Sequence, residues 1–551
     1  AAARPGAPLM RQLREMTEEE FAQVPKVTPG EARPRFRNRK IHREAAAQDL
    51  PGRHFGLVFP YTIEKLREAG AEWLTKAFHA AGTLPKDNSV RTMEVIALSI
   101  NPLAGEALGG SSIKCRVEVT YERPDDGLHT KLFGKIPLEP TDTSERFEHP
   151  KWFIDEPEAM FNRLLAASCP FRVPKTYFTD HSPESTNFIH LTEWIEYGKD
   201  WEPKEPWQVA KPNLKIRDYE LPRNGLERYL AFWRSLARFV AAYGLGTLGD
   251  KMRLAQVFEN LWPTLDPNFK SGWPTSPEER AGLAAMAKDP GYQSYVMQRA
   301  EGPLNLSIIQ MRTGVDFVMY IAPQLFAKEV RDPKFLLRML QEQAHVVQHS
   351  VEIDTYLVQY PELNCLFHPN TQLDNAFYYY KDEACTQMEA GVFDWGGAKG
   401  MPYIASMAGN LLSGAEPAML DEHQEDVVRA WVDEYHASGG SERLTYELIS
   451  TSVKLAQVSQ LNGTMGFITN LLKDQPRTSP LWKQVPSRFC PEIEDNYVRR
   501  ALVGQIDHVL HAWYSKKRSL YGAFLKWTQD NGDIIFPRPP LEYEVTLPNK
   551  R

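Results

Sequence analysis

One short run of the sequence carries the side-chain types and spacing of a metal site. Glu342 and His345 stand three residues apart and His349 follows one turn later, so a helix would place a carboxylate and two imidazoles on one face. A di-iron bundle needs a second run of this kind, and a zinc protease needs Glu directly after the first His, where Val346 stands. The sequence supplies neither, and it also lacks the P-loop and GxSxG patterns. We therefore interpret these residues as a helix face and find no support for P-loop or serine-hydrolase chemistry.

A second run, residues 366–396, joins a histidine, amides and acids to a hairpin pattern. It begins Leu366-Phe-His-Pro-Asn-Thr-Gln-Leu-Asp-Asn-Ala-Phe-Tyr378 and ends Ala390-Gly-Val-Phe-Asp-Trp-Gly396, with a polar turn between the two parts. This pattern predicts two strands and a turn, with Asp394 at the end of the second strand. Read without further context, Asn375 also suits a plain turn, and Asp394 a turn or a helix N-cap.

On these residues the run resembles the catalytic loop of the protein-kinase-like fold, in its aminoglycoside phosphotransferase and choline-kinase-like (ecdysteroid-kinase-like) branch. That branch has His-Gly-Asp, four residues, Asn, a short hairpin and then Ile-Asp-Trp or Ile-Asp-Phe. His368, Asn375 and Asp394 match it in register, and the resemblance extends over residues 90–412. It implies that Asn375 and Asp394 hold Mg²⁺, which neutralises charge on the phosphates of ATP. It implies a mainly structural role for His368.

The upstream parts of that fold follow in the family's order. Lys135 lies in a predicted strand where the family keeps its phosphate-binding lysine, although it would also suit an ordinary edge strand. Glu158 resembles the helix glutamate that pairs with this lysine, and Glu156 is the second choice. Residues 189–194, which include Glu193, resemble the hinge strand that holds adenine. A glycine-rich loop over the phosphates is matched by Gly109, Gly110 and Ser111.

The main departure from the family lies at Asn370, which stands where the family has its catalytic aspartate, with four residues between it and Asn375. The aspartate accepts or orients the proton of the substrate hydroxyl, and an amide oxygen is far too weak a base for this. Loss of a general base typically slows a reaction about 10²- to 10⁴-fold. Asp374 could replace it only if the loop were remodelled, and Ala405 and Ser406 occupy the region of the aspartate that braces the loop in the family. We therefore expect a pseudokinase-like, catalytically impaired protein.

Two kinds of pattern predict the α+β, two-lobed fold that would position these residues. Alternating residues at 113–121 and 130–136 flank the turn signal Arg123-Pro-Asp-Asp-Gly127, which predicts an antiparallel hairpin in a small β-rich lobe at 55–198. Helical periodicity dominates a larger lobe at 199–530. Further strands are predicted at Thr176–Thr179 and Phe188–Trp194, and helices at Ile63–Ala81, 156–168, Leu226–Tyr243, Ala281–Met286, Val315–Val330, Phe335–Leu357, Glu422–Ala437, Thr445–Leu472 and Tyr497–Gln529.

Composition narrows the class of protein. The 551 residues carry a net charge of -7, which argues against nucleic-acid binding through overall charge. No apolar stretch is long enough for a transmembrane helix, and five scattered cysteines without a CxxC motif favour a reducing compartment. The chain begins with Ala1, which would follow from removal of a mitochondrial or plastid transit peptide or from trimming of the chain.

Two segments outside the lobes, residues 1–54 and 531–551, are predicted to be extended arms. Six Lys or Arg residues lie between positions 31 and 43, so we expect the first arm to bind a protein partner. The favoured hypothesis is a pseudokinase-like accessory or peripheral subunit of a larger assembly. The alternative is an active ATP-dependent phosphotransferase that acts on a small hydroxyl compound.

Overall fold

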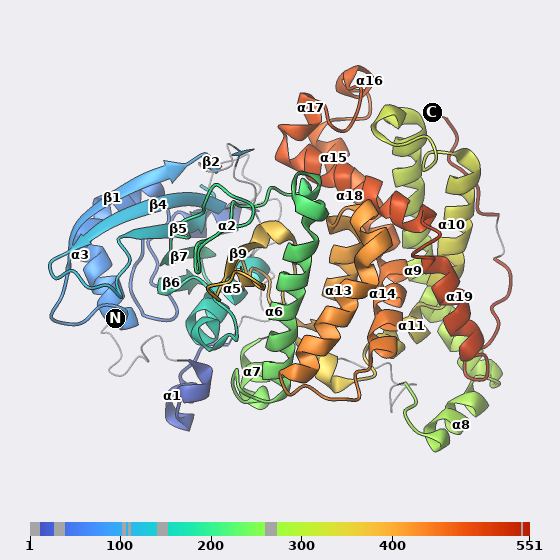
Figure 1. Cartoon of the computed structure of the whole chain (residues 1–551), viewed down its shortest axis with the longest axis horizontal. Helices are drawn as coiled ribbons and strands as arrows, with labels where there is room; N and C mark the ends of the chain where they lie inside the picture. Colours follow the sequence, from blue (N-terminus) through green and yellow to red (C-terminus); the bar gives the residue numbers. More distant parts are fainter. Residues whose placement is uncertain are drawn as a thin grey trace.

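Two lobes make up the described structure, one built on an antiparallel sheet and one almost wholly helical (Figure 1). The predicted α+β class is confirmed. Among the described residues, no helix has the length and apolar character that crossing a membrane requires. The computed structural model describes residues 12–26, 39–101, 106–107, 112–139, 152–258, 273–541 and 544–550.

The sheet has five strands in the order β1-β4-β5-β7-β6, all antiparallel. Strands β4 and β5 form the predicted hairpin around residues 123–127. Alternate residues of β4 are buried, as in Val117, because one face of the sheet packs against helix α3 (Ile63–Ala81) through Leu66 and Phe78. The strands are β1 (Val90–Leu98), β2 (Ile100–Asn101), β3 (Glu106–Ala107), β4 (Ser112–Tyr121), β5 (Lys131–Pro137), β6 (Thr176–Ser182) and β7 (Asn187–Glu193), of which β2 and β3 pair only with each other.

Helix α5 (Trp152–Leu164) packs against β6 and β7 and continues into a short 3-10 turn (Ala166–Ser168). In Figure 1 it lies between the sheet and helix α6 (Leu226–Gly244), close to the hairpin strand β9 (Ala376–Tyr380). This position brings one side of α5 to the sheet and its C-terminal part to the helical lobe. The predicted helix at 156–168 is confirmed, with its start four residues earlier.

The helical lobe is centred on α6, which packs on one side against strand β10 (Met388–Val392) and on the other against α13 (Pro417–Ala437). Figure 1 shows α14 (Tyr446–Gly466) and α9 (Pro290–Asp316) in the next layers. The remaining α-helices are α7 (Lys251–Val257), α8 (Pro277–Met286), α10 (Pro333–Val347), α11 (Ser350–Leu357), α12 (Tyr403–Gly409), α15 (Ile468–Asp474), α16 (Leu481–Gln484), α17 (Pro491–Glu494), α18 (Tyr497–Tyr514) and α19 (Leu520–Asp530).

Two small ribbons lie in the helical lobe beside α6. The predicted hairpin at 375–394 is confirmed as β9 and β10, with Tyr378 opposite Ala390. The second ribbon pairs β8 (Asn364–Phe367) with β11 (Lys399–Pro402). Together the two ribbons hold the ends of the 368–375 loop between two fixed strands, β8 before it and β9 after it.

Three predicted long helices differ from the structure, each for a local reason. The helix predicted at Phe335–Leu357 is split at Gln348, whose carbonyl accepts a hydrogen bond from Arg538 of the C-terminal tail. The helix predicted at Tyr497–Gln529 is split before Ser519, which has a left-handed φ of 44°. The helix predicted at Val315–Val330 ends in a π-turn before Pro323, because proline disfavours helical geometry at the preceding residue.

The N-terminal segment also differs from the prediction of an extended arm, in the parts that the structure describes. Residues 12–26 contain a 3-10 turn (Leu13–Glu15) and helix α1 (Glu18–Ala22), and Leu13 and Phe21 are buried in the main core. Helix α2 (Arg39–Ala46) follows, and His42 bonds to Thr186 beyond β6 at 2.6 Å. Apolar residues such as Leu13 and Phe21, which the basic composition obscured, pack the first of these parts against the chain itself. Residues 27–38, which contain three of the six basic residues of the predicted cluster, lie outside the described residues.

The C-terminal tail runs without helix or strand from residue 536 to residue 541, and again over residues 544–550, as predicted. It nevertheless packs on the helical lobe, because Ile534 and Phe536 are buried and Arg538 forms an ion pair with Glu352 in which both side chains are only 2% exposed. The tail is therefore part of the core of this lobe.

Candidate active site

A buried lysine joins the two lobes. Lys135 in β5 donates to Glu158 Oε2 of α5 at 2.6 Å and to Asp394 Oδ1, just after β10, at 2.8 Å. Its side chain is 12% exposed. The structure thus brings together three of the predicted site residues, and the predicted choice of Glu158 over Glu156 agrees with these contacts.

The mutual attraction of Lys135 and Asp394 keeps both side chains charged. Burial lowers the pKa of Lys135, but the carboxylates of Asp394 and Glu158 outweigh burial and the net pKa is raised. Burial acts in the opposite direction on Asp394, yet the attraction of Lys135 prevails and lowers the pKa of that carboxyl. At Glu158 burial is stronger than the attraction of Lys135, and the pKa is raised. Near neutral pH the group therefore contains an ammonium and an ionised Asp394 carboxylate.

His368 organises the loop between β8 and β9. Its Nδ1 accepts from the backbone N–H of Asn370 at 3.2 Å, and this fixes the proton on Nε2, which donates to the carbonyl of Phe393 at 2.9 Å. The ring is fully buried and packs edge-on against Trp395. Burial lowers the pKa of His368, so the ring is neutral and its role here is to tie the loop to the end of β10.

Asn375 lies beside Asp394 through this same network. Its Nδ2 donates to the carbonyl of Asn370 at 2.8 Å, and its own carbonyl accepts from the N–H of Phe393, one residue before Asp394. Asp394 itself has a φ of 61°, a conformation that non-glycine residues adopt rarely and often at functional sites. The side chain of Asn370 is half-buried, and no hydrogen bond joins it to another described residue.

The loop is braced by hydroxyl groups. Ser406 in α12 donates to the carbonyl of His368 at 3.0 Å and lies 3.1 Å from Thr371, whose Oγ1 donates back to the carbonyl of Ser406. The sequence indicated that the bracing aspartate of the family is absent from this region. The structure shows that a serine fixes the loop here, so the loop is ordered although the acid is missing.

Glu193, predicted at the adenine-binding hinge, uses its carboxylate within the protein. It forms an ion pair with Arg172 and accepts from the backbone N–H of Lys175 at 3.1 Å. Its side chain therefore fixes the segment before β6. The predicted glycine-rich loop residues Gly109, Gly110 and Ser111 lie outside the described residues.

The helix face that could have been a metal site is a packing surface. Glu342 accepts a hydrogen bond from Trp513 at 2.7 Å, and His345 is bonded to the hydroxyl of Tyr521 at 2.9 Å. His349 packs its ring against Phe524. In the part of the chain that the structure describes, no cluster of His, Cys, Asp and Glu has the arrangement of a metal site.

The structure also brings together two residues that the sequence analysis did not single out. Lys215, on the segment before α6, and Tyr497, at the start of α18, lie together, with Lys215 Nζ 5.6 Å from the Tyr497 ring centre. The carboxylates of Asp374 and Asp394 act electrostatically on Lys215. Lys215 is 282 positions away from Tyr497 in the chain, and no local motif marks either residue.

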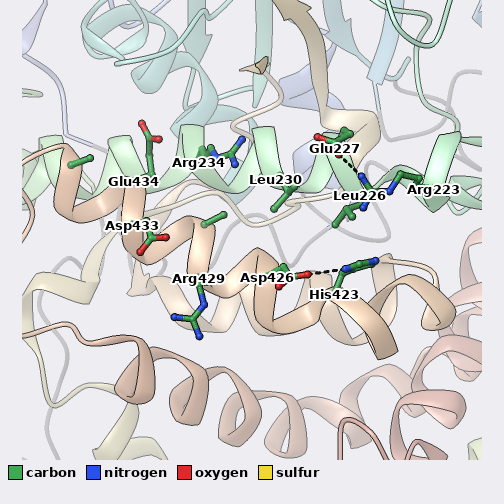
Figure 2. A pocket seen from close by; sticks show the side chains of 12 residues that line it. Arg223, Leu226, Glu227, Leu230, Arg234, His423, Asp426, Arg429, Asp433 and Glu434 are labelled. Carbon is green, nitrogen blue, oxygen red and sulfur yellow. Dashed lines mark hydrogen bonds and ion pairs between the residues drawn. The ribbon is translucent and has the colours of Figure 1, made fainter. Parts of the chain in front are cut away.

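A separate surface pocket lies between α6 and α13 (Figure 2). Its lining alternates basic and acidic side chains, including an ion pair of Arg223 with Glu227 and another of His423 with Asp426, each at 2.8 Å. None of the predicted site residues lines it.

Comparison with known proteins gives matches to solved structures only. No protein-family model matches the sequence, and no curated protein matches it. An aminoglycoside phosphotransferase assigned in Ralstonia eutropha is 10% identical over 76% of this chain and 92% of that one, with a TM-score of 0.33. Plasmodium vivax ethanolamine kinase is 10% identical over 76% and 90%, with a TM-score of 0.32. The GDP complex of aminoglycoside 2'-phosphotransferase-IIIa is 12% identical over 74% and 94%, with a TM-score of 0.32.

These proteins are of the kinds that the 366–396 run resembles. Because the superpositions are loose, the assignment of the site rests on the contacts of this chain's own residues. Those contacts are the lysine that bridges Glu158 and Asp394 and the loop that carries Asn370 and Asn375.

Proposed function

We propose that this chain is a kinase-like protein that binds Mg-ATP but transfers phosphoryl groups slowly or not at all. One observation carries the proposal: Lys135 bridges Glu158 and Asp394 beside an ordered loop, while the base position of that loop is Asn370. The first half of this observation supports nucleotide binding. The second half removes the group that would take the acceptor proton.

The residues present fit a Mg²⁺ ion by the chemistry of their donor atoms. Mg²⁺ takes oxygen ligands. The Nδ2 of Asn375 is used by the carbonyl of Asn370, which leaves the amide oxygen of Asn375 as the donor for a cation. Asp394 adds a carboxylate that stays ionised because Lys135 lowers its pKa. When bound, the ion would stabilise charge on the phosphates, and Lys135 would contact them.

The impairment follows from what Asn370 can do with an acceptor hydroxyl. Its amide can orient the hydroxyl by a hydrogen bond, but it cannot take the proton at neutral pH. Because phosphoryl transfer depends mainly on positioning and charge, a low residual rate is compatible with the remaining groups. The alternative function, an active phosphotransferase on a small hydroxyl compound, requires another proton acceptor.

Calorimetric titration of Mg-ATP tests the nucleotide part. We expect binding by the full chain, and an affinity at least about 10-fold lower for Asp394→Asn, since a charge-assisted contact is lost. Asp382→Asn is the matched control, because this exposed acid only caps the hairpin turn at Thr386. Equal Mg-ATP affinity in wild type and Asp394→Asn would remove Asp394 from the site.

Transfer from ATP to small hydroxyl compounds tests the catalytic part. We expect little or no product from the wild-type chain, and Asn370→Asp should raise any residual rate by about 10²-fold or more. Rapid turnover by the wild type would replace the pseudokinase proposal with the active alternative.

We further infer an accessory role through the basic cluster at 31–43. Residues 12–26 and helix α2, which includes the end of this cluster, are packed against the chain's own lobes, so deletion of residues 1–54 would also damage the core. Substitution of Arg33, Arg35 and Arg37 by Gln is the cleaner change. We expect these changes to shift the protein from an assembly to the size of the free chain, with its thermal unfolding unaltered. An unchanged assembly size would contradict the accessory role.

A further inference from the structure

The segment between the hinge and α6 runs along the catalytic-loop hairpin. Ala210 donates its backbone N–H to the carbonyl of Tyr378 in β9, and Gly225 packs against Leu373 in the catalytic loop. Lys215 lies between these two contacts in the chain. The segment therefore passes directly beside the catalytic loop.

The backbone around Lys215 is fixed from outside by α17 and α18. Arg500, whose side chain is buried, donates from Nε to the carbonyl of Lys215 at 2.9 Å. Arg217 is bound by Glu494 at 2.8 Å. Between them Ile216 has a φ of 58°, which is strained for a β-branched residue. This conformation fits because α18 presents Gly504, where an added Cβ would lie 2.2 Å from Ile216 Cγ2.

The side chain that this backbone presents is a cation without a close acidic partner. Among the ion pairs between described residues, none within 4.0 Å includes Lys215. Its ammonium faces the ring of Tyr497, and the carboxylates of Asp374 and Asp394 act on it electrostatically from beyond ion-pair distance. A strained, externally anchored loop that carries an ammonium with no acidic partner within ion-pair distance suits a ligand-binding role.

We propose that Lys215 and Tyr497 form an acceptor subsite beside Asn370, and that this subsite binds small hydroxyl compounds that carry an anionic group. An ammonium attracts a carboxylate or phosphate and repels a cationic amine, so the sign of the charge sets the class of ligand. The aromatic ring supplies an apolar wall for the carbon skeleton. This inference rests on the proposed function only in assuming that the nucleotide binds beside the same loop.

The test uses pairs of small hydroxyl compounds of opposite charge with the full chain. Glycerol 3-phosphate, 3-phosphoglycerate and gluconate are the anionic probes, and choline and ethanolamine are the cationic ones. Each is titrated by calorimetry, with and without Mg-ADP. We expect at least one anionic probe to bind more tightly than either cationic probe.

Variants of Lys215 test whether its ammonium binds the anionic probe. Lys215→Met should lower the affinity for the anionic probe by about 10-fold or more, the loss of one charge-assisted contact, and Lys215→Arg should retain most of it. Lys211→Met is the matched control, because this lysine lies on the same segment but its Nζ is 4.2 Å above the ring of Trp201. Unfolding curves in denaturant show whether each variant is folded.

Three outcomes would overturn the inference: tighter binding of a cationic probe, no binding of any anionic probe, or equal affinity in Lys215→Met and the wild type. Failure of the proposed function gives a different result. If Mg-ATP does not bind but the anionic probe binds in a Lys215-dependent way without nucleotide, the subsite stands and the nucleotide proposal falls.

Discussion

Helix α5 is held from two sides, and this arrangement makes a prediction about an ion pair outside the active site. Glu158 faces Lys135, whereas Glu156, two residues earlier, points to the other side of the helix and pairs with Arg53 at 2.9 Å. Further contacts hold the same N-terminal segment: Asp180 accepts from the backbone N–H groups of His54 and Phe55. The segment at 53–55 should therefore help to keep Glu158 in place.

The expected size of the effect follows from the burial of the two partners. Glu156 is 2% exposed and Arg53 is 31% exposed. Removing one partner of a buried pair costs about 3 to 5 kcal/mol, and partial exposure of Arg53 reduces our expectation for Arg53→Ala to about 2 kcal/mol. Glu156→Gln should cost less than about 1 kcal/mol, since the Arg53 that remains can reach water. The two halves of one ion pair are thus predicted to be unequal.

Denaturant unfolding and Mg-ATP titration measure the two consequences. Arg53→Ala should lower both the free energy of unfolding and the Mg-ATP affinity, the latter in proportion to the fraction of molecules that keep α5 in place. Lys131→Ala is the control, because its pair with Glu196 is exposed at both ends and is expected to contribute about 0 to 1 kcal/mol. A stable Arg53→Ala variant with unchanged Mg-ATP affinity would refute the reasoning, as would a larger effect of Glu156→Gln.

Three other predictions concern regions around the site. Gly504→Ala should lower the free energy of unfolding by about 1 to 3 kcal/mol, because the added Cβ would collide with Ile216. The control is Gly463→Ala on α14, where the Cβ would meet open space and the change should be neutral or stabilising. Calorimetric unfolding measures both variants. Burial raises the pKa of Asp218 to about 8, so between about pH 4 and 8 the folded state retains a proton that the unfolded state has lost. The free energy of unfolding should therefore decrease as pH rises through this range, by at most about 1.4 kcal/mol per pH unit. Asp218→Asn should weaken this pH dependence, which denaturant unfolding at several pH values measures. Deletion of residues 1–26 should lower the melting temperature, since it removes Leu13 from the core; an unaltered melting temperature would show that this contact contributes little.

Sequence reasoning succeeded where a local pattern and its order along the chain carry the information. The alternation in residues 113–121 predicted β4, and the 366–396 run predicted the hairpin that presents Asp394. Lys135 and Glu158 could be matched to the family's lysine and glutamate because each lies in a segment with clear strand or helix periodicity, and the two segments follow in the family's order. Their 2.6 Å contact follows once β5 and α5 pack together.

The same reasoning failed where distant parts of the chain decide the outcome. The split of the helix predicted at 335–357 depends on Arg538, and the placement of Lys215 depends on Arg500 and Gly504. These partners are distant in sequence, so the residues around Gln348 and Lys215 give no indication of them. The basic composition of the first arm was also misleading, because a few apolar residues such as Leu13 decide whether such a segment docks.

The folded structure constrains Asn370 and the neighbouring charged residues of the proposed site differently. Lys135, Glu158 and Asp394 form one network in which removal of Lys135 leaves both acids without their cation, and for buried Glu158 this is expensive. Asn370 has no such constraint: its side chain is half-buried and bonds to no described residue, and the loop is held by His368 and Ser406 instead. Folding alone is therefore enough to retain the lysine and its two acids. The presence of the network is therefore no measure of phosphotransfer, whereas the rate gained by Asn370→Asp tests the proposed impairment directly.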